Sequence, residues 1–180
     1  MRQVWALWGN VIVVSALAVP LALLAVRLLA RRRARDGHPH PTRTAAADVA
    51  MVAGTVPWIW MILTPRPALS TVSLVPLRDL AELFDSPAVT VFVQVGGNLL
   101  VFAALGALLP TRVARLASLA RIAAVAACAS CTVELLQYGL RLGRVSSVDD
   151  VLVNTAGAVL AAMVTRRWWA SRTAAETGVR

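Results

Sequence analysis

Six polar side chains lie in or beside apolar segments in the second half of the chain. Their types suit ion pairing, proton transfer or ligand recognition. An ionised group at bilayer depth is costly, so such groups usually face a protein interior and have a function. Residues three or four apart share a helix face, and the two pairs formed this way flank one short connection, so we expect them to face each other. The six residues are Asn98, Glu134, Gln137, Arg144, Asp150 and Asn154.

These residues allow several kinds of chemistry. The planar guanidinium of Arg144 could bind a phosphate or carboxylate. Glu134 and Asp150 are the candidate catalytic residues, because paired carboxylates can act as general acid and base. Alternatively, the six side chains pair with one another and only fix the packing of helices.

Other polar residues are assigned structural roles. Ser146 or Ser147 is expected to cap a helix rather than act as a nucleophile, since no His stands near. Asp149 points away from Asp150 and is predicted to be a solvated charge at a helix N-terminus. A further acidic stripe is interpreted as a solvated face. Its members are Asp79, Glu82 and Asp85.

The composition indicates a membrane protein. The chain has 180 residues, of which 58% are hydrophobic and 15% charged, too few polar residues for a soluble domain of this length. Its net charge is +9, but the basic residues, all Arg, cluster beside apolar segments, which argues against a nucleic-acid partner. Membrane lipids are the expected partners.

Neither the cysteines nor the histidines predict a metal or a cofactor. Cys128 and Cys131 have C-x-x-C spacing inside an apolar run and are interpreted as small apolar residues on one helix face. His38 and His40 lie in a polar loop, and two ligands do not complete a zinc shell.

Five apolar segments predict an all-α, polytopic membrane helical bundle, since each is close to the length that spans a bilayer. A short interfacial helix is expected at Leu80 to Phe84. Basic residues follow the first, third and fifth segments, which predicts an N-out/C-in orientation in a bacterial cytoplasmic membrane. The spans are Gln3 to Ala30, Val49 to about Thr64, Val89 to Leu109 (ended by Pro110), Ile122 to Leu140, and Val148 to Thr165.

We divide the chain into three parts. Residues 1–48 form the first transmembrane helix and an Arg-rich cytoplasmic loop, residues 49–170 form a membrane domain, and residues 171–180 form a cytoplasmic tail. The six polar side chains then lie near the outer leaflet. Small residues, among them Gly106, Gly157 and Ala158, are expected to bring helices close together there.

The ordered motifs of the second half resemble the VanZ-like family. They are Asn98-Leu99-Leu100-Val101-Phe102-Ala103-Ala104-Leu105-Gly106, Glu134-x-x-Gln137, Gly143-Arg144, and Asp150-x-x-x-Asn154-Thr155-x-Gly157-Ala158. The family usually has Pro where Ala104 stands, which predicts a straighter third helix here, and often an acid where Ser147 stands.

The resemblance implies a bacterial integral membrane protein of the cell envelope. The member that gave the family its name is similar to an accessory factor in resistance to the glycopeptide antibiotic teicoplanin. Our first hypothesis is a pocket, built from the six residues, that recognises an envelope lipid or a lipid-linked or glycopeptide-related component. The alternatives are a membrane-embedded enzyme acting on a lipid head group and a small proton-coupled transporter.

Overall fold

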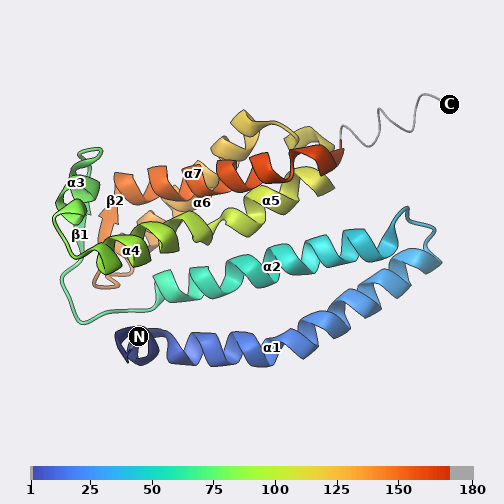
Figure 1. Cartoon of the computed structure of the whole chain (residues 1–180), viewed down its shortest axis with the longest axis horizontal. Coiled ribbons are helices and arrows are strands. Elements are labelled where there is room, and N and C mark those ends of the chain that lie inside the picture. Colours follow the sequence, from blue (N-terminus) through green and yellow to red (C-terminus); the bar gives the residue numbers. More distant parts are fainter. Residues whose placement is uncertain (1, 171–180) are drawn as a thin grey trace.

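The computed structural model describes residues 2–170, and the side chains from residue 9 onward. The predicted tail at 171–180 therefore lies outside the described residues. Long helices run beside one another in alternating directions (Figure 1). They are α1 (Arg2–Arg35), α2 (Pro41–Leu63), the consecutive α4 (Ala88–Val101) and α5 (Ala103–Arg112), α6 (Leu119–Gly139) and α7 (Val148–Val164).

Four of the described helical segments are long and apolar enough to cross a membrane. They are Gly9–Arg35, Pro41–Leu63, Ala88–Arg112 and Leu119–Gly139. The predicted fifth span corresponds to α7, whose 17 residues extend about 25 Å, slightly less than the ~30 Å hydrocarbon core.

Helices α1 and α2 form a hairpin with a much shorter loop than expected. Helix α1 continues through the Arg cluster to Arg35, and α2 begins at Pro41 rather than near residue 49. Proline suits the first turn of a helix because the missing N–H would have no partner there. His38 and His40 lie in this turn, as predicted.

The third apolar segment differs from expectation in two ways. It is interrupted at Phe102, whose φ of −113° and ψ of 13° leave the helical range, so the predicted straighter helix is wrong. Pro110 does not end the segment, because α5 continues to Arg112. An interior proline removes one backbone hydrogen bond and kinks or breaks a helix, yet Pro110 lies fully buried inside α5, two residues before its end.

The bundle core lies among α4, α5, α6 and α7. Glycine allows α7 to approach its neighbours: a Cβ on Gly157 would stand 2.0 Å from the carbonyl oxygen of Leu99, and one on Gly106 would stand 2.1 Å from that of Ala158. The predicted close packing at small residues is confirmed. The buried apolar cluster comprises Val101, Phe102, Ile122, Ala126, Val133, Ala158, Ala162 and Trp169.

Two short strands and one short helix form a small cap over one end of the bundle (Figure 1). No strands were predicted from the sequence. Strands β1 (Thr71–Ser73) and β2 (Val145–Ser147) form a parallel two-stranded ladder in which Thr71 pairs with Val145. Helix α3 (Arg78–Phe84) follows β1 and confirms the predicted short helix. Short 3-10 turns, η1 (Ala114–Leu116) and η2 (Arg166–Trp168), lie at the other end.

Gly143 allows the connection after α6 to pass against the connection after α2. Its φ is +67°, and a Cβ there would stand 2.0 Å from the carbonyl oxygen of Arg66. Two backbone hydrogen bonds flank this contact, from Arg66 N to Leu142 O over 2.8 Å and from Thr71 N to Arg144 O over 3.2 Å. The two connections are thereby joined into the base of the cap.

Candidate functional site

The six predicted site residues come from the cap and the helix segments beneath it. Asn98 lies on α4, Glu134 and Gln137 on α6, and Arg144 directly before β2. Asp150 and Asn154 lie in the first two turns of α7. Their hydrogen bonds divide them into three groups with different partners.

Glu134 fixes the start of α7. Its buried Oε2 accepts a hydrogen bond from Ser147 N over 3.0 Å, and its backbone carbonyl accepts one from Ser146 Oγ over 3.0 Å. Ser147 Oγ in turn accepts from Asp149 N over 3.1 Å and is the N-cap of α7. The predicted capping role of these serines is confirmed for Ser147.

Gln137 and Arg144 bind the end of α2. Gln137 Nε2 donates to Ile62 O over 2.9 Å. Arg144 Nη2 donates to Met61 O over 2.6 Å, and its Nε and Nη2 each lie 3.3 Å from Thr64 O. The last carbonyls of a helix have no partners within the helix and carry a partial negative charge, which an arginine satisfies well.

Arg144 remains charged in this position at neutral pH. Burial, aided by the positive charge of Arg66, lowers the pKa of its guanidinium to about 10, while the carboxylates of Asp150 and Glu134 act in the opposite direction.

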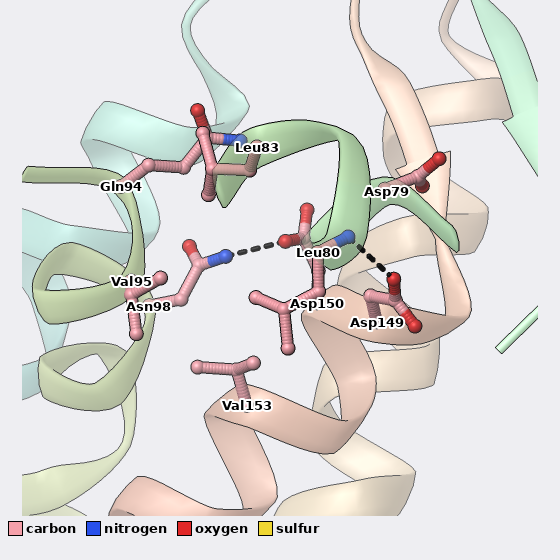
Figure 2. Close-up of a pocket in the computed structure, with 9 residues that line it drawn as sticks. All are labelled: Asp79, Leu80, Leu83, Gln94, Val95, Asn98, Asp149, Asp150 and Val153. Carbon is pink, nitrogen blue, oxygen red and sulfur yellow. Dashed lines mark hydrogen bonds between the residues drawn. The ribbon is translucent and has the colours of Figure 1, made fainter. Parts of the chain in front are cut away.

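Asn98 and Asp150 join α4 to α7, because Asn98 Nδ2 donates to Asp150 Oδ1. Beside them is a small pocket between α3, α4 and α7 with a volume of about 20 Å³, enough for a water molecule or one small chemical group. Figure 2 shows carboxylates and amides around it together with apolar side chains. The lining residues are Asp79, Leu80, Leu83, Gln94, Val95, Asn98, Asp149, Asp150 and Val153.

Asp149 is not the solvated charge that was expected. It is 4% exposed, and its carboxylate accepts a hydrogen bond from Leu77 N. It also accepts one from Leu80 N over 2.9 Å, which Figure 2 shows. These amides begin α3, whose N-cap residue Leu77 offers no side-chain acceptor. A carboxylate favours a helix N-terminus, so Asp149 caps α3 rather than its own helix.

Asp79 was also misassigned to a solvated face. Its two carboxylate oxygens accept from Ser73 Oγ over 2.8 Å and from Ser147 Oγ, so it connects α3 to both strands of the cap. Glu82 and Asp85 are exposed, as expected. Ser73 is near Asp79 in the sequence, but Ser147 is distant, so the sequence alone could not show that Asp79 joins the two strands.

Asn154 belongs to the bundle rather than to the pocket. It is 2% exposed, and its Nδ2 donates to Ser130 Oγ on α6 over 2.8 Å. Asp150, one turn earlier on α7, instead accepts from Asn98 on α4. Within the described part of the chain, the buried Oδ1 of Asn154 has no hydrogen-bond partner.

The described side chains provide no arrangement for a metal: no group of three His, Cys, Asp or Glu among residues 2–170 could hold one. Cys128 and Cys131 are exposed and unpaired.

The apolar helices and the polar network that joins them under a small cap define a helical membrane protein. The chain belongs to the VanZ/LLP1 family, whose family model matches residues 49–169 and thus includes α7 and most of α2. The searches of curated proteins and of solved structures found no match.

Proposed function

We propose that the chain is a multi-pass protein of the bacterial cytoplasmic membrane that crosses it five times in the N-out/C-in orientation. The alternating directions of the long helices support this topology (Figure 1). So does the distribution of charge: the end opposite the cap carries the Arg-rich α1–α2 turn, the α5–α6 connection and the end of α7. Basic ends remain cytoplasmic, which puts the cap on the outer side.

We further propose that the pocket under the cap recognises a polar group of an envelope lipid or lipid-linked precursor. The observation that carries this proposal is the set of three aspartates around one small cavity at the bundle end. Asp79 and Asp149 are held by the cap, whereas Asp150 is held by Asn98. Carboxylates accept hydrogen bonds and favour cations, so an ammonium or hydroxyl group is the expected ligand group.

The volume of the pocket limits what enters it. A space of about 20 Å³ takes one such group and excludes a whole head group, so the rest of the ligand would lie outside, toward α3 and α4. Arg144 is assigned a structural role in this proposal, because its Nε and Nη2 donate to α2 carbonyls.

The test compares Asp150→Asn with Asp85→Asn, since Asp85 is exposed at the end of α3. Cells that express each variant are assayed for tolerance to teicoplanin and other envelope antibiotics, together with membrane abundance. We expect Asp150→Asn to lose tolerance at normal abundance and Asp85→Asn to keep it. Unchanged tolerance in Asp150→Asn would reject the pocket as the functional site.

A further inference from the structure

One carboxylate joins two guanidinium groups at the end of the molecule opposite the cap. Arg112 donates from Nε to Asp48 Oδ1 over 2.6 Å and from Nη2 to Asp48 Oδ2 over 3.3 Å. Arg33 Nη2 also donates to Asp48 Oδ2. The three residues belong to α5, α2 and α1, so this junction is where those helices meet, and two positive charges there share one negative charge.

The junction is partly shielded from water. The side chains of Arg33, Asp48 and Arg112 are 16%, 30% and 26% exposed. Salt screens partly buried charges less than exposed ones, and a partly buried charge without a counter-charge is unfavourable. Moreover, Nη1 of Arg33 is buried and has no acceptor within the described residues. An anionic group at the junction would supply both a counter-charge and acceptor oxygens.

The surroundings indicate a membrane surface. The exposed Trp168 lies under the guanidinium of Arg167, with 4.0 Å from Arg167 Cζ to the ring centroid, and Trp favours the level of lipid head groups. Further arginines lie at this end of the molecule, near the end of α1, the start of α2, the connection from α5 to α6 and the turn after α7. Apart from Asp48, Asp36 is the acid found there among the described residues. These arginines are Arg31, Arg32, Arg35, Arg43, Arg115, Arg121, Arg166 and Arg167.

Apolar surface begins directly beside the junction. Within two turns of the junction, α1 and α2 expose large aliphatic side chains, including Leu28 and Val52. A nucleic acid would gain nothing from this surface, whereas a phospholipid could place its phosphate at the arginines and its acyl chains along the helices. Basic pockets between membrane helices bind anionic head groups in this manner.

We propose that the junction of α1, α2 and α5 is a binding site for the phosphate group of an anionic phospholipid, held by Arg33 and Arg112. Asp48 lies between the two guanidinium groups and occupies the donors that the lipid phosphate would use. The site is separate from the pocket under the cap and does not depend on its proposed function.

The experiment titrates the purified full-length protein, in a neutral detergent, with phosphatidylglycerol or phosphatidylcholine and counts bound lipid by native mass spectrometry. We expect wild type to prefer phosphatidylglycerol. Arg112→Gln should weaken phosphatidylglycerol binding about fivefold, the effect of about one arginine near an anionic surface. Arg166→Gln removes an exposed arginine from the same end and should change binding less than about twofold.

A second variant separates lipid binding from folding. Asp48→Asn removes the competing carboxylate and should strengthen phosphatidylglycerol binding, whereas a purely structural junction would give unchanged or weaker binding. Equal binding of the two lipids by wild type, or equal losses in Arg112→Gln and Arg166→Gln, would overturn the proposal. Full competition by millimolar inorganic phosphate would also overturn it, because the ligand would then be free phosphate. If the variants fail to fold, the wild-type lipid comparison decides alone.

Discussion

The carboxylate of Glu134 on α6 accepts a hydrogen bond from the backbone N–H of Ser147, the residue that caps α7. Both residues are buried, with exposed fractions of 9% and 6%. Glu134 therefore positions the first turn of α7, on which Asp149 and Asp150 lie, and its effect on the pocket is exerted through that turn.

This contact predicts that Glu134→Ala and Glu134→Gln differ. Alanine leaves the buried Ser147 N–H without an acceptor, which costs about 1–3 kcal/mol, so the midpoint of thermal unfolding in detergent should fall. Glutamine retains an acceptor oxygen and should keep stability close to that of wild type. If Glu134→Gln loses envelope tolerance at wild-type stability and abundance, the negative charge itself is required, and Glu134 does more than hold Ser147.

Asp149 should govern the docking of α3. Asp149→Ala removes the acceptor for Leu77 N and Leu80 N, and we expect a loss of about 1–2 kcal/mol from two partly buried donors. Hydrogen exchange at these two amides should accelerate. Asp149→Asn keeps one acceptor oxygen and should give an intermediate rate. Asp85→Asn serves as the control, and acceleration there of similar size would show that any loss of charge near α3 suffices.

Arg144→Lys should loosen the end of α2. Lysine provides a compact ammonium without the planar fork that reaches both Met61 O and Thr64 O, so one carbonyl loses its donor, at a cost of about 1 kcal/mol. Faster hydrogen exchange in the last turn of α2 is the expected measurement. Arg141→Lys, an exposed substitution in the same connection, should leave this exchange unchanged.

Gly157→Ala should separate α7 from α4. The new Cβ would meet the carbonyl oxygen of Leu99 at 2.0 Å, so the helices must move apart. We expect overpacking to lower stability by about 1–3 kcal/mol. Gly96→Ala is the matched control, since nothing lies within 4 Å of a Cβ there. It should be neutral or slightly stabilising, because Ala has the higher helix propensity. Equal effects of the two substitutions would contradict the close approach of α7.

Sequence patterns predicted the helices well, whereas of the six candidate site residues only Asn98 and Asp150 line the pocket. The apolar segments, the small residues at Gly106 and Gly157, and the N-cap at Ser147 all follow from local spacing and composition. Their basis is helical periodicity, which a sequence displays directly.

The cap was inaccessible because its contacts are nonlocal. Asp79 and Ser147 are 68 residues apart in the sequence, and Asp149 and Leu77 are 72 apart. A three-residue strand has too little periodicity to be recognised, and its partner is distant in the chain. Without the β1–β2 ladder, Asp79 could only be assigned to a solvated face, and Arg144 only to a ligand or to a carboxylate partner. The last carbonyls of any helix lack donors within that helix. This general need at the end of α2 was the sequence clue to the role of Arg144.

Because a chain is synthesised from its N-terminus, the β1–β2 ladder can form only late in synthesis. Strand β1 is synthesised long before β2. The terminal carbonyls of α2 likewise lack these side-chain donors until Gln137 and Arg144 have been added to the chain. The cap therefore closes only after most of the protein has been synthesised and inserted. Truncation before residue 145 would leave the earlier helices in the bilayer with an open end, a state that membrane quality-control proteases could recognise.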